Sequence, residues 1–254
     1  MNLTGNTILI TGGGSGIGRG LAESLRALGN QVIIAGRRQH ALDETIAANP
    51  GMKSLALDIE DPAAIRDFAA KVVAEFPSLN VLINNAGIMR AEKLLAQQSD
   101  LADAEATVTT NLLGPIRLTA ALLPQLLKQS RAAIINVSSG LAFLPLVITP
   151  TYCATKAAIH SYTVSLRYQL RDTAIEVLEL IPPYVQTNLM DRNADDPRAM
   201  PLHQFLTEVM EILKQQPSPP EICVENVKRL RFAAESGKFD QIFNGLNASM
   251  TDSH

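Results

Sequence analysis

The sequence contains little of the chemistry that metal-binding and disulfide-linked proteins need. Its 254 residues include two cysteines and four histidines. The cysteines, Cys153 and Cys223, stand far apart, and no Cys-x-x-Cys or His-Glu-x-x-His motif occurs. A disulfide framework and a metal site are therefore not expected. Cys153 has no evident histidine partner, so we interpret it as a buried packing residue rather than a nucleophile.

Basic charge, aromatic residues and long apolar runs are also scarce. Lysine and arginine total 22 against 25 acidic residues, and aromatic residues make up 4% of the chain. Because no basic stripe is interleaved with aromatics, nucleic acid is not an expected partner. No apolar run approaches the roughly 18 residues of a membrane span, and the N-terminus has no basic and apolar leader segment. We therefore expect a cytoplasmic protein with no membrane partner.

The sequence does contain a regular alternation of short aliphatic runs and longer helical patterns. Most runs are apolar on both faces, which is typical of parallel strands covered by helices on two sides. The segments between them are long enough for crossover helices. We predict one α/β domain over residues 1–254, a doubly wound Rossmann fold whose mostly parallel sheet has about seven strands and helices on both faces. The expected strands are Thr7–Ile10, Gln31–Ala35, Ser54–Leu57, Val81–Ile83, Ala133–Val137, Ile175–Ile181 and Phe239–Phe243.

Helix limits and irregular segments can also be predicted. Helices are expected over Gly18–Leu28 and Pro62–Phe76, and Asp61 before a first-turn proline is a good N-cap. Residues 188–201 are rich in Asp, Arg, Asn and Pro and precede a helix expected near Leu202. We interpret residues 188–216 as a mobile flap on the substrate side and residues near 247–254 as a disordered tail.

The first expected strand runs into a glycine-rich turn and then into a helix. Gly12 suits the tight turn, Gly16 lets the backbone approach a pyrophosphate, and Gly18 permits close packing of helix on strand. Free N–H groups at the helix start attract an anion. The turn predicts a dinucleotide site, and a structural turn without a ligand is the alternative. The site residues of this segment are Gly12, Gly14, Ser15, Gly16, Ile17 and Gly18.

Arg37 and Arg38 follow the second expected strand, where dinucleotide folds usually meet the adenosine ribose. An acidic residue here would accept hydrogen bonds from the ribose hydroxyls of NAD, whereas arginine complements the 2′-phosphate of NADP. No acidic residue ends this strand, so NADP(H) is favoured over NAD(H). The alternative is that both arginines are solvated surface charges.

Tyr152 and Lys156 lie four residues apart in a helical pattern, which places a phenol and an ammonium on one helix face. A free phenol is a poor acid or base at neutral pH, but a nearby ammonium and an oxidised nicotinamide both favour the phenolate. Tyr152 could then exchange a proton with a reacting oxygen. The pair alone is a modest signal, because a tyrosine packed on a lysine stem has the same spacing.

Three further polar residues fall at sites suited to catalysis. Ser138 and Ser139 directly follow an expected strand, at the edge of the sheet where open α/β folds bind ligands. Either could also be a turn or capping residue. Asn111 interrupts an otherwise apolar helical stretch. It either marks a local break in the helix, which frees a backbone carbonyl group, or is a hydrogen-bonded polar residue at a helix interface.

Taken in order, the glycine turn, Asn84–Gly87, Asn111, Ser139 and Tyr152–Lys156 resemble the motif series of the short-chain dehydrogenase/reductase family, in its compact branch. The resemblance covers roughly the first 190 residues. It implies an enzyme that moves a hydride between NAD(P) and a small-molecule carbonyl or alcohol. Ser139 is chosen over Ser138 because the 13 residues from it to Tyr152 match the family's usual separation.

The resemblance also implies a role for each matching residue. Tyr152 is the general acid and base, Ser139 stabilises the oxyanion, Asn111 holds a relay water, and Lys156 contacts both the ribose and Tyr152. Tyr152 and Lys156 thus belong to the cofactor site as well. The other implied cofactor contacts are Asp58, Ile59, Asn85, Ala86 and Gly87 on the adenine side, and Pro182, Val185 and Thr187 near the carboxamide.

Two segments depart from the family pattern. Pro182-Pro183 replaces the usual Pro-Gly, which resembles a bacterial subgroup of oxidoreductases associated with D-alanine transfer. The C-terminus lacks the common glycine-rich ending, so we expect a homodimer or homotetramer formed through the helices around Asn111 and after Tyr152. A catalytically silent dinucleotide-binding redox sensor and an NAD(H)-dependent enzyme of the same class remain the alternatives. An apolar substrate cleft is expected unless its residues fill the core, and an acidic substrate bound by Arg192 and Arg198 is the alternative. The expected cleft residues are Leu141, Phe143, Leu144, Val147, Tyr184, Met190, Phe205, Leu206 and Met210.

Overall fold

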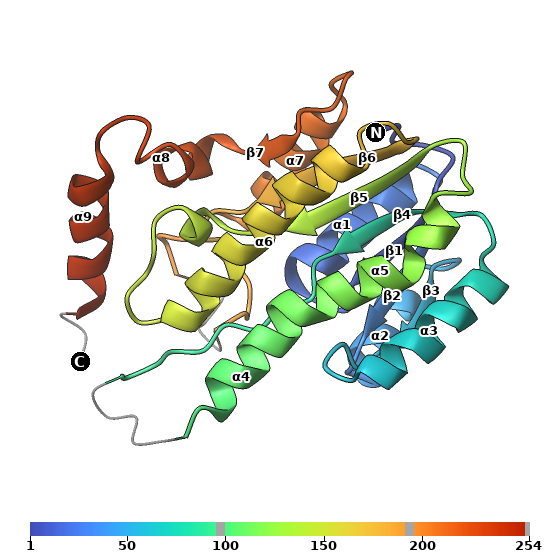
Figure 1. The fold of residues 1–254 in the computed structure, drawn as a ribbon, viewed down its shortest axis with the longest axis horizontal. Coiled ribbons are helices and arrows are strands. Elements are labelled where there is room, and N and C mark those ends of the chain that lie inside the picture. Colours follow the sequence, from blue (N-terminus) through green and yellow to red (C-terminus); the bar gives the residue numbers. More distant parts are fainter. Residues whose placement is uncertain (95–99, 191–195, 252–254) are drawn as a thin grey trace.

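Parallel strands form the centre of the computed structural model, which describes residues 1–94, 100–190 and 196–251 (Figure 1). The strands form one sheet in the order β3-β2-β1-β4-β5-β6-β7, and every neighbouring pair is parallel. Strand order reverses between β1 and β4, and such a switch point opens a crevice at the carboxyl ends of the strands. The strands are β1 Thr7–Thr11, β2 Gln31–Gly36, β3 Lys53–Ala56, β4 Leu79–Asn84, β5 Ala132–Val137, β6 Ile175–Ile181 and β7 Glu221–Cys223.

Helices cover both faces of the sheet, as the apolar strands require. One core contains side chains of α1 (Gly16–Ala27), α2 (Gln39–Ala48) and α7 (Leu202–Leu213). The other contains side chains of α3 (Pro62–Glu75), α5 (Gly114–Leu126) and α6 (Pro150–Gln169). Alternate residues of β1 divide between the cores, with Ile8 and Ile10 in the first and Leu9 in the second. The predicted doubly wound α/β fold is therefore confirmed.

The remaining helices lie at the edges of this arrangement. A π-helical turn, Thr109–Leu113, joins α4 (Ala102–Val108) to α5. Short 3-10 turns occur at Gly140–Ala142 and Glu225–Val227, and the latter leads into α8 (Lys228–Arg231). The last helix, α9 (Phe239–Thr251), stands beside the loop that follows β5 (Figure 1).

The prediction of a strand at Phe239–Phe243 was wrong. This segment begins α9, and the seventh strand is Glu221–Cys223. Phe239, Ile242, Phe243 and Leu246 have helical spacing, and all four pack in one small cluster with Leu144 and Ala233. The true strand was missed because it has three residues, of which only Ile222 is fully buried.

Other predicted limits can be compared directly. The carboxylate of Asp61 accepts a hydrogen bond from the Ala63 N–H, which confirms the N-cap of α3, and α7 begins at Leu202. The predicted tail overlaps α9, which continues to Thr251, while residues 252–254 lie outside the described residues. Residues 191–195 of the predicted flap also lie outside them, and a short parallel bridge joins Val185 to Met200 on either side. The flap remains a prediction.

Candidate active site

The glycine-rich turn after β1 has a backbone that side chains would disrupt. Gly12 and Gly16 have φ angles of 68° and 52°, in the left-handed region that favours glycine. A Cβ atom on Gly18 would lie 2.4 Å from the carbonyl oxygen of Gly12. One on Gly14 would lie 3.2 Å from Ala41 of α2. The turn thus brings its backbone close to α1 and α2, and the start of α1 offers N–H groups to an anion.

The segment after β4 is fastened to this turn by Thr11, a residue that the sequence analysis did not assign. The Thr11 hydroxyl accepts hydrogen bonds from the N–H groups of Asn85 and Ala86, both at 3.0 Å. The Asn85 amide donates in return to the Thr11 carbonyl oxygen at 2.9 Å. Asn85, Ala86 and Gly87 therefore lie beside the glycine turn at the switch point. Thr11 could have been found as a hydroxyl at the end of a buried strand.

A pocket of about 520 Å³ opens beside the glycine turn, at the ends of β1 and β2. Arg38 lines it and donates a hydrogen bond to the Ser15 hydroxyl at 3.2 Å. Arg19 also lines it, one turn into α1, and was not identified from the sequence. This pocket contains two guanidinium groups next to the glycine turn. Its lining residues are Gly14, Ser15, Gly16, Arg19, Arg38, Gln39, His40, Ala41 and Glu44.

Arg37 is held elsewhere. Its guanidinium forms an ion pair with Glu60 at 2.5 Å, and the Thr110 hydroxyl donates to the same carboxylate oxygen at 2.9 Å. Asp58 accepts a hydrogen bond from the Glu60 N–H. Ile59 is buried, and a Cβ on Gly114 would lie 2.6 Å from its side chain. The two arginines that the sequence treated alike therefore have different surroundings.

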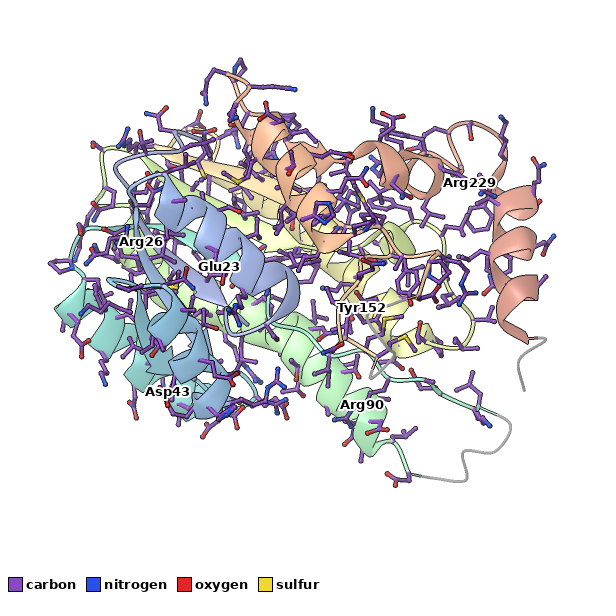
Figure 2. All side chains as sticks on the ribbon, turned by 180° about the vertical axis from the view of Figure 1, so that it is seen from behind. Glu23, Arg26, Asp43, Arg90, Tyr152 and Arg229 are labelled. Carbon is purple, nitrogen blue, oxygen red and sulfur yellow. The ribbon has the colours of Figure 1, made fainter. Side chains whose placement is uncertain are left out.

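Tyr152, Lys156 and Ser139 meet at the carboxyl ends of β5 and β6. Tyr152 and Lys156 lie one turn apart on α6, with the lysine Nζ 5.6 Å from the tyrosine ring centroid, and both are buried. Lys156 donates to the carbonyl oxygen of Val137 at 2.8 Å, at the end of β5. Figure 2 shows Tyr152 between the body of the sheet and α9. The pair therefore stands beside the serine-bearing strand end.

The structure distinguishes the two serines. The Ser138 hydroxyl donates to the buried carboxylate of Glu179 at 2.5 Å. The Ser139 hydroxyl instead accepts from the Leu141 N–H and makes a hydrogen bond with Tyr152. Ser139 is therefore the serine that faces the phenol, as the spacing argument selected.

Asn111 lies in the π-helical turn between α4 and α5. Its amide accepts from the N–H of Ile88 and donates to the carbonyl oxygen of Ile88, both at 2.8 Å. A Cβ on Gly87 would lie 3.3 Å from the Asn111 Oδ1 and 3.8 Å from the Lys156 Nζ. The expected local break is thus present, and it places Asn111 beside Gly87 and Lys156. The water that Asn111 was predicted to hold remains a prediction.

Burial changes the acidity of both catalytic candidates. It raises the pKa of Tyr152 above its usual range, which the hydrogen bond with Ser139 opposes. It lowers the pKa of Lys156 from 10.5 to about 8, which the charge of Glu179 opposes. Burial has the largest effect on this pKa, so the phenol is protonated at neutral pH. The expectation that the ammonium and an oxidised nicotinamide together favour the phenolate stays a prediction, because it concerns the protein with its cofactor.

The loop after β6 completes the site. The Pro182 carbonyl oxygen accepts from the Gly140 N–H at 2.9 Å, and Val185 is buried. The methyl group of Thr187 would lie 3.3 Å from a Cβ on Gly16. This loop therefore extends from the serine strand to the glycine turn.

Apolar side chains surround Tyr152, but they are only partly those expected. Leu146 and Cys153 are buried with Tyr152, and Met89, Leu141, Ile148 and Leu246 pack against them. Cys153 is a packing residue, as predicted, and burial raises the pKa of its thiol. By contrast, Phe205, Leu206 and Met210 belong to the core between α1 and α7, while the Tyr184 hydroxyl donates to Asp196.

A parallel Rossmann sheet with a glycine-rich turn and a Ser-Tyr-Lys group at one edge defines a dinucleotide-dependent oxidoreductase. Residues 6–198 match the short chain dehydrogenase family. The chain belongs to this family, whose members act on CH–OH groups, and the family predicted from its motifs is confirmed. Within the described residues, none of the helices has the length and apolar character of a membrane span.

Individual known proteins agree with this assignment. The chain is 39% identical over 251 residues to "Uncharacterized oxidoreductase DltE" of Bacillus subtilis, covering 97% of this chain and 98% of that protein. This match supports the bacterial subgroup suggested by Pro182-Pro183. The closed form of serine dehydrogenase complexed with NADP+ has 27% identity and a TM-score of 0.73, over 82% of this chain and 89% of that one. A short chain dehydrogenase/reductase from Burkholderia phymatum in complex with NAD shares the fold, with a TM-score of 0.81 at 23% identity over 94% and 96% of the chains.

Proposed function

We propose that this protein is an NADP(H)-dependent enzyme that interconverts a small carbonyl compound and its alcohol, with Tyr152 as general acid and base. The observation that carries the proposal is the convergence of Ser139, Tyr152 and Lys156 at the sheet edge that also holds the glycine turn. Ser139 follows β5, Tyr152 and Lys156 lie on α6, and the glycine turn follows β1, so their meeting is a property of the fold and not of local sequence.

The acid–base chemistry follows from the surroundings of Tyr152. Its pKa is raised by burial, so the phenol holds its proton and suits the reduction direction. Tyr152 donates that proton to the carbonyl oxygen, and the Ser139 hydroxyl donates a hydrogen bond to the same oxygen while negative charge develops there. A nicotinamide, when bound, supplies or accepts the hydride. In the oxidation direction Tyr152 takes the alcohol proton.

Lys156 and Asn111 support this exchange. The Lys156 ammonium near the phenol favours the phenolate left after proton donation, and the carbonyl oxygen of Val137 fixes its position. Asn111 lies beside Gly87 and Lys156 through its two hydrogen bonds to Ile88. We propose that a water held by Asn111 returns a proton to Tyr152 through Lys156.

The residues present suit a dinucleotide. The backbone of the glycine turn lies so close to its neighbours that a Cβ on Gly12 or Gly18 would collide with them. Without side chains in the way, the backbone N–H groups at the start of α1 can bind a pyrophosphate. Asp58, Ile59 and residues 85–87 are proposed to lie on the adenine side, and Pro182, Val185 and Thr187 near the carboxamide. Arg38, Arg19 and Ser15 line one pocket beside the turn. The charge of Arg38 supports NADP(H) over NAD(H), because a guanidinium group complements a 2′-phosphate. Arg19 adds positive charge to the same pocket, although its guanidinium is paired with Glu23 at 2.8 Å.

The substrate is proposed to be small and partly apolar. Met89, Leu141, Ile148 and Leu246 pack around Tyr152 and Cys153, and they supply dispersion contacts but little charge. Because Leu246 comes from α9, the C-terminal helix is part of this apolar surface. Within the predicted flap of residues 188–216, the part before α7 is proposed to cover the substrate on the same side, because α7 itself is packed in the core.

Cofactor titration followed by a substrate panel tests the proposal. We expect NADPH to raise the melting temperature more than NADH does, and reduced-nicotinamide absorbance to fall with at least one aldehyde or ketone. Tyr152→Phe should keep cofactor binding and lose about a thousandfold in kcat. If the wild type binds the cofactor but turns over no panel compound, and Tyr152→Phe behaves like it, a silent redox sensor replaces the enzyme. Stabilisation by NADH alone would make NAD(H) the cofactor.

We further propose that the enzyme is a cytoplasmic homodimer or homotetramer. Leu127 after α5, and Val164 and Tyr168 on α6, are exposed large apolar residues, 46% and 68% for the last two. Apolar side chains on these helices suit a symmetric contact between copies. Light scattering after size-exclusion chromatography measures the oligomer, and a monomer at micromolar concentration would contradict the proposal.

A further inference from the structure

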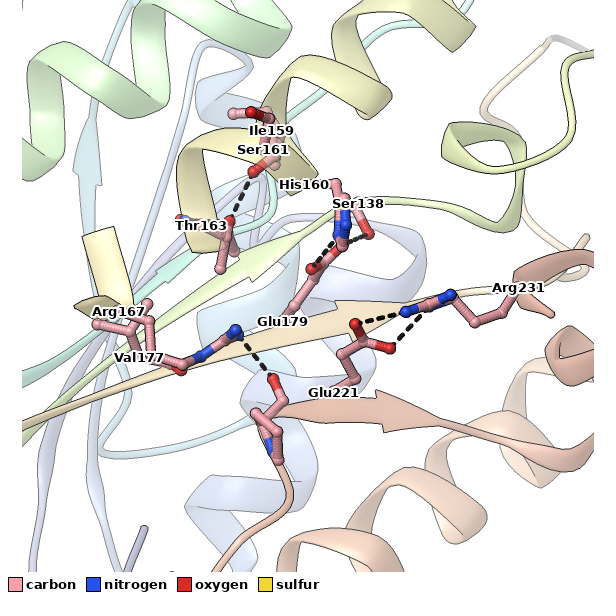
Figure 3. Close-up of polar contacts among 12 residues, drawn as sticks. Ser138, Ile159, His160, Ser161, Thr163, Arg167, Val177, Glu179, Glu221 and Arg231 are labelled. Atoms are coloured by element: carbon pink, nitrogen blue, oxygen red, sulfur yellow. Dashed lines mark hydrogen bonds and ion pairs between the residues drawn. The ribbon is translucent and has the colours of Figure 1, made fainter. Parts of the chain in front are cut away.

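Glu179 is a fully buried carboxylate that the proposed mechanism does not use. It lies on β6, and its side chain is 0% exposed. One carboxylate oxygen accepts from the Ser138 hydroxyl at 2.5 Å, and the other lies 2.8 Å from the Nδ1 of His160 (Figure 3). Because an ionised carboxylate only accepts, the His160 Nδ1 carries the proton in this contact. Burying a carboxylate costs free energy unless it is hydrogen-bonded, and both oxygens of Glu179 are.

The two partners of Glu179 belong to the elements that hold the catalytic candidates. Ser138 precedes Ser139 at the end of β5, where the Ser138 N–H also donates to the Leu180 carbonyl oxygen. His160 follows Lys156 on α6 by four residues, and Lys156 follows Tyr152 by four, so the three lie along one helix face. Glu179 thus connects β5 and α6 through side chains only.

The carboxylate next to Glu179 in the sheet has its own partner. Glu221 of β7 stands next to it in the sheet, and the Arg231 guanidinium binds both oxygens of Glu221 at 2.7 and 3.0 Å (Figure 3). Arg231 also pairs with Glu235. Cys223, on the same strand, has a thiol whose pKa is raised by burial and by Glu221. The charge of Glu221 is therefore balanced by Arg231, whereas that of Glu179 faces α6.

A metal site is a less suitable interpretation of the residues around Glu179. His160, Glu179 and Glu221 have ligand atoms within 4.8 Å of one another. However, Ser138 donates to Glu179, and the Arg231 guanidinium occupies both oxygens of Glu221. A cation would have to displace these donors and stand beside a guanidinium, which like-charge repulsion opposes.

We propose that Glu179 is a positioning residue for the reaction: it sets Ser139 relative to Tyr152 and Lys156 by binding Ser138 and His160, and it directs a negative charge toward Lys156. This inference rests on the proposed function. The hydrogen bonds fix the geometry of the strand end and of the helix, and reaction rate depends steeply on such geometry. The charge acts on Lys156, whose pKa it raises against the effect of burial.

Glu179→Gln tests the inference because it keeps the shape and removes the charge. We expect kcat with a panel carbonyl to fall about tenfold, while the KM for NADPH changes by less than about twofold. The high-pH limb of kcat should move to lower pH, because Lys156 then loses its proton at lower pH. Glu176→Gln is the matched control. It lies on the same strand, half-exposed and paired with the N-terminus, and should leave both values unchanged.

An activity-independent reading separates this inference from the proposed function. In protein labelled at the lysine ε-carbon, with the Lys156 signal assigned through Lys156→Arg, NMR follows the titration of Lys156. We expect its pKa to fall in Glu179→Gln and to stay unchanged in Glu176→Gln. If the wild type reduces no carbonyl, the proposed function fails while this titration still tests Glu179. An unchanged titration together with an unchanged kcat in folded Glu179→Gln would overturn the inference.

A second variant covers the case in which Glu179→Gln does not fold. Ser138→Ala keeps the carboxylate and removes one of its two hydrogen bonds. We expect a lower kcat with the Lys156 titration unchanged, because position changes and charge does not. Wild-type kcat in this variant would contradict the positioning role.

Discussion

The turns after β1 and β2 differ from the turns after β5 and β6 in what holds them in place. Around the glycine turn, backbone packs on backbone, and Cβ atoms on Gly12 and Gly18 would collide with neighbouring residues. Around the catalytic group, buried polar side chains bind one another over long sequence separations, as in Ser138 with Glu179, which are 41 residues apart. The turns after β1 and β2, here the nucleotide half of the site, depend on glycines that allow close backbone packing. The turns after β5 and β6, here the catalytic half, depend on hydrogen bonds between polar side chains.

This difference has energetic consequences. A Cβ on Gly18 cannot be accommodated unless the turn shifts, because interiors are close-packed and backbone has little freedom to move away. A buried polar pair tolerates a neutral substitute of the same shape better than the loss of one partner, which leaves a donor or acceptor unsatisfied. Steric changes should therefore dominate in the nucleotide half, and changes of charge in the catalytic half.

The largest effect is expected for Gly18→Ala. Its Cβ would lie 2.4 Å from the Gly12 carbonyl oxygen and from the Asn85 amide, so the turn must shift. We expect NADPH affinity to fall about a hundredfold and stability to fall by about 1–3 kcal/mol. Isothermal titration with NADPH and urea unfolding measure the two effects. Gly245→Ala is the control, since nothing lies within 4 Å of its Cβ. If Gly18→Ala binds NADPH with wild-type affinity, close packing at Gly18 does not determine cofactor binding.

The next effect concerns Lys156 and the change in the free energy of unfolding with pH. Its pKa is lowered from 10.5 to about 8 in the folded chain. Between these values the unfolded chain binds more protons, so the lysine makes folding more favourable as pH rises from about 8 to 10.5, by about 3 kcal/mol in total. Urea unfolding of the wild type and of Lys156→Met at pH 7.5 and pH 10 isolates this contribution. The difference in unfolding free energy between the two proteins should grow with pH, and a constant difference would contradict the lowered pKa.

Arg38→Ala should have a smaller effect that is confined to one cofactor. Arg38 lines the pocket beside the glycine turn, so removing it should weaken NADPH about tenfold and leave NADH nearly unchanged. Arg37→Ala is the matched control, because Arg37 is paired with Glu60. Titration of each variant with both cofactors measures the ratio of NADPH affinity to NADH affinity. An equal loss of NADPH affinity in Arg38→Ala and Arg37→Ala would mean that the two arginines contribute equally to cofactor choice.

The parts of the site that could be predicted from the sequence are those whose signals are local. The glycine turn, the cap at Asp61 and the Tyr152–Lys156 spacing each lie within a few residues, where turn and helix rules apply. Arg37 and Arg38 could not be distinguished, because the partner that holds Arg37 is Glu60 from another strand end. Local rules give the type of residue at a site but not its partner.

The catalytic half was harder to predict because its contacts are long-range. Glu179 lies in a run that reads as an ordinary buried strand, and its partners stand 41 and 19 residues away. Phe239–Phe243 was assigned to the wrong element, since a five-residue segment in which Phe239, Ile242 and Phe243 are apolar is too short to distinguish a strand from a helix without its neighbours. Burial raises the pKa of Tyr152, and burial depends on the whole fold, so this effect could not be predicted from the spacing of Tyr152 and Lys156.

The smallest effect is expected for Asp61→Ala, which tests a local feature of the nucleotide half against the long-range contacts. The Asp61 carboxylate accepts from the Ala63 N–H at 2.7 Å at the start of α3. Losing this cap should cost about 1 kcal/mol, which lowers the melting temperature by about 3 °C in a domain of this size. Asp67→Ala, on an exposed position of the same helix, is the control and should change the melting temperature far less. Because the cap touches no catalytic residue, kcat should stay at the wild-type value in both variants. A fall in kcat for Asp61→Ala would mean that α3 and the catalytic half are coupled. The nucleotide half would then not be held by local contacts alone, as the comparison of the two halves assumes.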